Sequence, residues 1–211
     1  NQRDPILNYL ERLGYRPQDL RRIVVTHADY DHVGSLADLQ EATQARVYAG
    51  AETARLIAAG ESPQHMPRLA QWVLDKFMRY RPVPEAVIHV LEPGDTLPVL
   101  GGLTAIASPG HTRDHFSFYS THAGVLFAGD ALNNRGGKLS LAAARITADM
   151  DAARQSGRAL LKLAPALIAC GHGPPAENHD LGEVMSLLQD LKSDPSQDRK
   201  STRLNSSHSS V

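Results

Sequence analysis

The sequence predicts a single α/β domain in which helices and strands form layers. Amphipathic helical segments lead repeatedly into short β-branched strands, and no internal repeat or linker interrupts this alternation. The chain of 211 residues is long enough to bury one sizeable core. We therefore expect one domain over residues 1–197 and a separate tail over residues 198–211.

The first half of the chain alternates between helices and strands. A segment with apolar residues at helical spacing leads into a short β-branched strand over residues 23–26. Residues 35–43 form the next predicted helix, with Ser35 at its N-cap position. A strand over residues 45–50 and a helix that ends at Gly60 complete this half.

Residues 62–84 differ in character, because prolines bracket an amphipathic helix. Its apolar residues fall on one face at helical spacing: Leu69, Trp72, Val73 and Phe77. A helix of this kind beside a binding site would form a lid or a pocket wall and influence the choice of substrate. The same pattern also fits a helix that simply packs on a sheet, and both alternatives stay open.

The second half is predicted to contain mainly strands, followed by two helices. Turn signals such as "EPGD" and "LGG" separate five strands over residues 86–91, 95–99, 103–107, 116–120 and 125–128. A helix, a strand with its loop, and a last helix then follow over residues 143–165, 166–173 and 179–193.

The composition excludes several classes of function. The formal net charge is −1 and the pI is about 6.9, so the chain has no excess of basic residues that would attract nucleic acid or an anionic membrane. It contains no apolar run long enough for a transmembrane helix. The single cysteine, Cys170, can form neither an internal disulfide nor a CxxC metal pair. We expect a cytoplasmic protein with a small-molecule substrate and leave its oligomeric state open.

The two ends of the chain are not used to predict the fold. The chain begins at Asn1 without an initiator methionine, so we expect a fragment or a processed form, and a signal peptide would have been lost with the missing part. The Ser-rich tail over residues 198–211 closely resembles the translation of a common sequencing adapter, and a natural disordered tail is the alternative. Neither alternative gives the tail a function, so His208 is set aside as a ligand.

Polar side chains gather at the ends of four predicted strands. Each group follows an apolar strand, and the residues are His27, Asp29, Asp31 and His32, then His111, then Asp130, then His172. Strand ends hold side chains stiffly, and the loops beyond them leave an open mouth. Taken singly, each residue is an ordinary turn residue. Together they offer the nitrogen and oxygen donors that a borderline divalent metal accepts.

The set resembles the metallo-β-lactamase-fold superfamily, whose hallmark is an HxHxDH loop, then a His, a bridging Asp and a final His. The corresponding stretches here are "HADYDH", "SPGHT", "AGDAL" and "GHGPP". The resemblance covers roughly residues 23–175 and implies a four-layer αββα sandwich with the metals at one edge. Because that family opens with several strands before its first helix, the resemblance also implies that the first strands are missing.

The resemblance implies a site for two divalent ions. The first ion would be held by His27, Asp29 and His111, the second by Asp31, His32 and His172, and Asp130 would bridge them. Zinc is the expected metal, with manganese or iron as alternatives.

Asp29 departs from the family pattern, because it stands where the family usually has a histidine and makes the loop an HxDxDH version. A carboxylate reaches zinc at roughly the same distance as an imidazole, about 2.0–2.2 Å. Its negative charge would favour a harder ion such as manganese or iron(II). The alternative is that Asp29 is too short to reach the metal.

The reaction implied by the resemblance is hydrolysis of a small ester, lactone, thioester or lactam by a metal-bound hydroxide. Asp31 would orient this nucleophile and accept its proton. A nucleophilic serine elbow is absent, and we expect Cys170 to be a small buried hydrophobe. Two alternatives stay open: a mononuclear iron enzyme like the persulfide dioxygenases, using His27, His111 and Asp130, or a non-catalytic member of the fold.

Two further residues are candidates for contact with the substrate. Tyr30 lies inside the ligand loop, where a packing role is the alternative. His115 follows His111 closely and would either contact the substrate or support a ligand from behind. The histidines His65, His89 and His122 lie outside the ligand pattern, and His179 is expected to begin the last helix.

Overall fold

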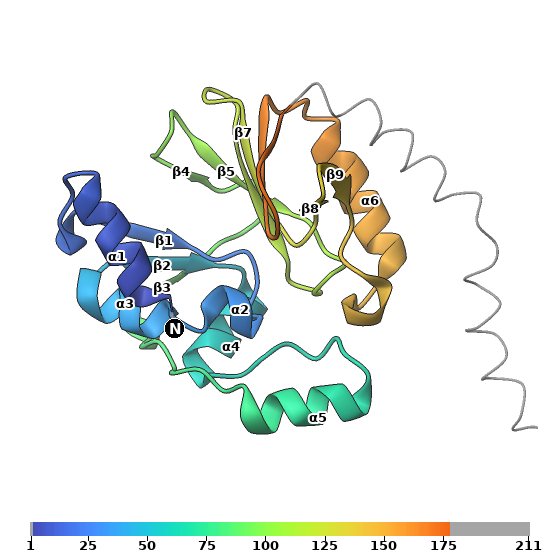
Figure 1. Cartoon of the computed structure of the whole chain (residues 1–211), viewed down its shortest axis with the longest axis horizontal. Coiled ribbons are helices and arrows are strands. Elements are labelled where there is room, and N and C mark those ends of the chain that lie inside the picture. The colour runs from blue at the N-terminus through green and yellow to red at the C-terminus, as the bar shows by residue number, and fades with distance from the viewer. Residues whose placement is uncertain (1, 178–211) are drawn as a thin grey trace, which may run out of the picture.

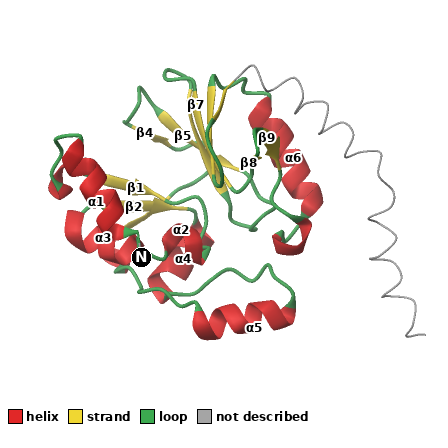
Figure 2. Cartoon of the chain, in the orientation of Figure 1, coloured by secondary structure: helices red, strands yellow, loops and turns green. Residues whose placement is uncertain are grey.

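The computed structural model describes residues 2–177. Two sheets face each other and helices cover their outer sides, which gives the layer order helix, sheet, sheet, helix (Figures 1 and 2). The four-layer αββα arrangement implied by the sequence resemblance is therefore present. The predicted last helix over residues 179–193 and the tail over residues 198–211 lie outside the described residues.

The first sheet consists of three parallel strands in the order β1-β2-β3, with the bounds Arg22–Val24, Arg46–Ala49 and Ile88–Val90. Parallel neighbours need crossover connections, and helices provide them here. The helices of this half are α1 (Arg3–Arg12), α2 (Tyr30–Val33), α3 (Leu36–Thr43), α4 (Ala51–Ala59) and α5 (Arg68–Phe77), with 3-10 turns at Pro17–Asp19 and Glu85–Val87.

The second sheet has six strands in the order β11-β10-β7-β6-β5-β4. Their bounds are β4 Thr96–Leu97, β5 Leu103–Ala107, β6 Phe116–Ser120, β7 Val125–Gly129, β10 Leu167–Cys170 and β11 Ala176–Glu177. Only β7 and β10 pair in parallel in this sheet, so both reach the same edge with their carboxyl ends. The connection between them holds a hairpin of β8 (Asn133–Arg135) and β9 (Lys138–Ser140), a 3-10 turn at Ala144–Ile146, and α6 (Met150–Leu161).

Three apolar clusters hold the layers together. One lies between the first sheet and its helices, where Val47 and Ile57 are fully buried. A second joins β7 and β10 to α6, and it includes Leu126 and Leu160. The third fills the space between the two sheets, where Phe118 is fully buried. Among the described residues, no helix is both long and apolar enough to cross a membrane.

The elements agree with the sequence prediction best where turn signals flank a strand. Strands β5 and β6 have the predicted bounds. The helix predicted over residues 143–165 is wrong at its start, because the Asp149 carboxylate accepts hydrogen bonds from the backbone N–H groups of Asp151 and Ala152 and caps α6 there. The sequence analysis also does not predict the short polar hairpin of β8 and β9.

The apolar face of α5 is exposed rather than packed on a sheet. Leu69 and Phe77 expose 76% and 69% of their surface, and Trp72 exposes 56%. The alternative in which this helix simply covers a sheet is therefore wrong. In Figure 1, α5 lies apart from both sheets, and the chain that leads into it passes beside α4.

Candidate metal centre

Strand ends from both sheets meet at one edge of the sandwich. His27 follows β1, and the backbone N–H of Phe116 in β6 donates to Thr26 at the end of that strand. Asp130 and His172 follow the parallel pair β7 and β10, whose ends are joined by a hydrogen bond from the Gly171 N–H to the Gly129 carbonyl oxygen. Parallel strand ends therefore place side chains from residues far apart in sequence next to each other.

The loop that carries His111 is fastened to the start of α6. The backbone N–H groups of Asp149 and Ala148 donate to the carbonyl oxygens of Gly110 and His111, and the Ser156 hydroxyl donates to the Pro109 carbonyl oxygen. Three hydrogen bonds thus hold the backbone of the loop that carries His111.

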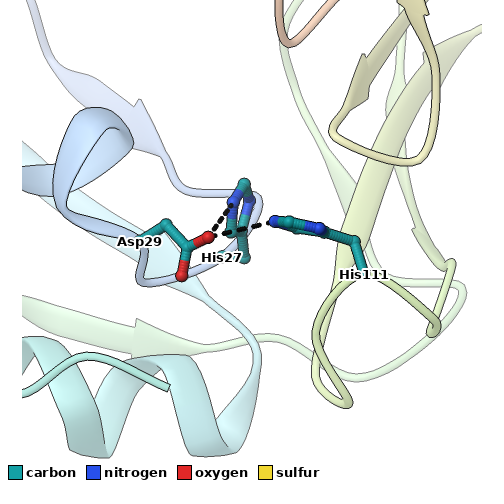
Figure 3. A group of neighbouring side chains, drawn as sticks. All are labelled: His27, Asp29 and His111. Carbon is teal, nitrogen blue, oxygen red and sulfur yellow. Dashed lines mark hydrogen bonds and ion pairs between the residues drawn. The ribbon is translucent and has the colours of Figure 1, made fainter. Parts of the chain in front are cut away.

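The first group of predicted ligands is buried and compact. His111 Nε2 lies 3.0 Å from Asp29 Oδ2, and His27 Nε2 lies 3.5 Å from the same oxygen. Figure 3 shows both rings directed at this carboxylate. The side chain of His27 is fully buried, and that of His111 is 2% exposed.

The second group lies nearer to solvent. His172 Nε2 is 3.3 Å from Asp31 Oδ2, and these side chains are 48% and 60% exposed. His32, which is 17% exposed, joins them from α2. This group therefore forms the open side of the centre.

Asp130 connects the two groups. Its Oδ1 lies 3.3 Å from His32 Nε2, and its Oδ2 lies 3.5 Å from the Nε2 atoms of both His111 and His172. The structure therefore brings together all seven residues that the sequence analysis selected as ligands: His27, Asp29, Asp31, His32, His111, Asp130 and His172.

The spacing of these atoms fits divalent cations. Bonds of about 2.0–2.2 Å to one tetrahedral ion would put neighbouring donor atoms about 3.3–3.6 Å apart. The nitrogen–oxygen separations between the predicted ligands are 3.0–3.9 Å. Among the described residues, His27 Nε2, His32 Nε2 and Asp130 Oδ1 are buried and have no hydrogen-bond partner. Buried polar atoms without partners are costly unless something binds them, and a metal ion would do so.

Both buried carboxylates are held in their charged form. Burial raises the pKa of Asp29, but its hydrogen bond with His111 and the nearby imidazoles of His27 and His65 outweigh this effect and leave the pKa well below its ordinary value. Burial also raises the pKa of Asp130, but the nearby imidazoles of His32, His27 and His111 outweigh this effect and leave the pKa below its ordinary value. Burial lowers the pKa of His27 and so favours the neutral imidazole that a metal requires.

His115 lies in the interior behind the ligands and is 1% exposed. Its Nε2 accepts from the backbone N–H of Asp130, so its Nδ1 carries the hydrogen and donates to the Ser108 hydroxyl. Ser108 contacts the Ser117 hydroxyl, which donates to the Ala128 carbonyl oxygen. With both nitrogens used in this way, the arrangement favours support of Asp130 over contact with a substrate.

Tyr30 and Cys170 occupy the borders of the centre. Tyr30 is the first residue of α2 and is 37% exposed, so it stays a candidate for substrate contact. Cys170 is only half-buried, in contrast to the full burial expected from the sequence, and this burial raises the pKa of its thiol to about 11. A neutral thiol supplies no nucleophile at neutral pH.

His65 is a member of this cluster that sequence reasoning did not select. Its side chain is 3% exposed, and its Nε2 lies 3.2 Å from Asp29 Oδ2. It comes from the segment between α4 and α5, which the sequence places in no strand. Its place in the cluster becomes apparent only from the structure, in which the segment between α4 and α5 brings His65 to Asp29.

A family profile described as "Metallo-beta-lactamase superfamily" matches residues 1–172. The chain belongs to the metallo-beta-lactamase superfamily. A solved member in a di-iron-bound form, TTHA1623, superimposes with a TM-score of 0.62 and 26% identity, covering 86% of this chain and 83% of that one.

Two curated proteins with similar sequences are named as hydrolases. A probable metallo-hydrolase of Mycobacterium tuberculosis is 35% identical over 136 residues, covering 60% of this chain and 42% of that protein. A hydroxyacylglutathione hydrolase of Serratia proteamaculans is 32% identical over 134 residues, covering 63% and 40%. The chain therefore spans less than half the length of these two relatives.

Proposed function

We propose that this protein is a hydrolase with two divalent metal ions that cleaves a small thioester or related ester. The observation that carries the proposal is the position of Asp130, whose two carboxylate oxygens contact histidines of both ligand groups. A carboxylate placed in this way can bridge a pair of ions. The names of the hydroxyacylglutathione hydrolase and of the di-iron structure support the substrate class and the number of ions.

The residues of the proposed metal centre have different roles on its open side and on its buried side. When bound, the ions supply an acidified water molecule and polarise the carbonyl oxygen of the substrate. Asp31 is the carboxylate on the open side, and its Oδ2 is positioned to accept a proton beside His172. His27 and His111 keep the opposite side rigid and free of bulk water, because their side chains are almost completely buried.

A polar cleft beside the centre is the proposed substrate site. It lies between α4 and the loop after His111, and its polar lining includes Glu52, Thr53, His65, Thr112, Arg113 and Asp114. The exposed guanidinium of Arg113 suits an anionic group on the substrate, since Arg binds carboxylates at two positions.

Metal content and activity test this proposal together. We expect two equivalents of a divalent metal per chain after purification, and turnover of thioesters above that of β-lactams and phosphodiesters in one substrate panel. A chelator should abolish this turnover, and zinc, manganese or iron(II) should restore it. One iron per chain with oxygen uptake on sulfur substrates would show a mononuclear oxygenase instead. No turnover in any metal would favour a non-catalytic member of the fold.

The variant Asp29→His is expected to change the preference of the centre among metals. It removes one negative charge and replaces an oxygen donor with a nitrogen donor, which favours zinc over manganese. We expect the ratio of zinc affinity to manganese affinity to rise by at least about tenfold. Competition with a chelator measures both affinities, and an unchanged ratio would show that Asp29 is not a ligand.

A further inference from the structure

His65 reaches the metal centre from a segment that carries no ligand motif. The chain between α4 and α5 returns to the cluster and places His65 Nε2 3.2 Å from Asp29 Oδ2. The His65 ring also meets the His111 ring at a centroid distance of 5.1 Å. Three imidazoles, those of His27, His65 and His111, therefore converge on one carboxylate oxygen at 3.0–3.5 Å.

The hydrogen bonds of His65 determine which nitrogen is free. Its Nδ1 lies 3.1 Å from the carbonyl oxygen of Pro63, which can only accept, so Nδ1 carries the hydrogen. The neutral ring then has its lone pair on Nε2, and this buried atom has no hydrogen-bond partner among the described residues. A histidine that donates one N–H to a backbone carbonyl and leaves the other nitrogen bare has the arrangement typical of a metal ligand.

The segment around His65 is held in place on its other side. The backbone N–H groups of His65 and Met66 both donate to the side-chain oxygen of Gln71 in α5, a residue that is 5% exposed. The direction of the imidazole is thus fixed by backbone contacts and not by Asp29 alone. A lone pair that faces a carboxylate oxygen at 3.2 Å is repelled unless a proton or a metal cation lies between the two atoms. Without a metal, a protonated His65 would donate to Asp29, and a bound ion would take the place of that proton.

We propose that His65 is a ligand of the first divalent ion, together with His27, Asp29 and His111. The proposal rests on the metal-dependent function proposed above. It gives the segment between α4 and α5 a role in building the centre. With Asp29 in place of the histidine that is usual in the family, the first ion would have only two imidazole ligands, and His65 would supply the third.

Cobalt binding tests this role without using turnover. Metal-free wild type, His65→Ala, His65→Gln and the control His122→Ala are titrated with Co²⁺, and visible absorption and chelator competition are recorded. His122 is an exposed histidine in the turn between β6 and β7. We expect both His65 variants to bind one of the two ions at least about tenfold more weakly and with a changed absorption band. The control should match wild type.

The glutamine variant separates a ligand from a hydrogen-bond donor. Glutamine can donate to Asp29 but is a poor ligand, so wild-type affinity and absorption in His65→Gln would overturn the proposal, as would unchanged binding in His65→Ala. The double variant Asp29→His/His65→Ala should recover most of the lost affinity, because it returns an imidazole to the first ion. Failure to recover in a folded double variant would count against the proposal. If wild type itself binds no Co²⁺, the proposed function fails as well.

Discussion

Replacing Asp130 with alanine is expected to cost the protein both ions and to lower kcat/KM by at least about 10³-fold. The reason is that the two oxygens of this carboxylate contact His32, His111 and His172, so one substitution removes a ligand from both groups at once. Removal of Asp31 or His172 instead should affect mainly the second ion, since these residues lie on the exposed side.

Metal analysis and thermal unfolding measure this effect. A bound ion stabilises the folded state, so added zinc should raise the Tm of wild type and leave that of Asp130→Ala unchanged. Asp151→Ala provides a matched control, because Asp151 is an exposed carboxylate on α6 that pairs only with Arg154 among its ionic contacts in the described residues. Two full equivalents of metal in Asp130→Ala would refute the bridging role.

Substituting Gly110 with alanine is expected to destabilise the fold and to disorganise the loop that carries His111. Gly110 has φ +145°, which side chains rarely adopt, and an added Cβ would lie 2.3 Å from the Cα of Ala153 in α6. The clash is with backbone and cannot be relieved by a side-chain rotation. We expect a loss of at least about 3 kcal/mol in the free energy of unfolding, and weaker binding of the first ion.

Gly136→Ala is the matched control for this substitution. Gly136 also has a positive φ, +62°, but an added Cβ there meets nothing within 4 Å. Its cost should therefore be only the conformational one, about 1–2 kcal/mol. Denaturant unfolding of both variants measures the difference. Equal losses in the free energy of unfolding would show that the close approach of the loop to α6 does not make Gly110 more sensitive than Gly136.

The sequence predicted the residues of the centre better than the path of the chain around it. His27, His111, Asp130 and His172 each follow an apolar strand, and that local pattern is visible without a structure. The distances between them depend on the parallel pairing of β7 with β10 and on the facing of two sheets, which the linear sequence does not encode locally. The resemblance to a family supplied that step.

The differences between the sequence prediction and the structure have local physical causes. The start of α6 was placed too early because the alanine-rich stretch before Asp149 favours a helix, whereas the carboxylate cap fixes the true beginning. His65 was missed because its segment has no periodicity, and its position depends on contacts with Gln71 and Pro63. The sequence offers His115 as a contact with the substrate or as a support for a ligand, and its burial and its hydrogen bond to Asp130 cannot be read from spacing.

The unequal exposure of the two ligand groups has a kinetic consequence. His27 and His111 are almost completely buried, while half or more of Asp31 and nearly half of His172 face water. An ion among the outer residues exchanges with solution directly, whereas one among the inner residues must pass through the outer position or wait for the loops to open. Depletion should therefore begin with the outer ion, so that partly depleted molecules would retain the ion held by His27 and His111.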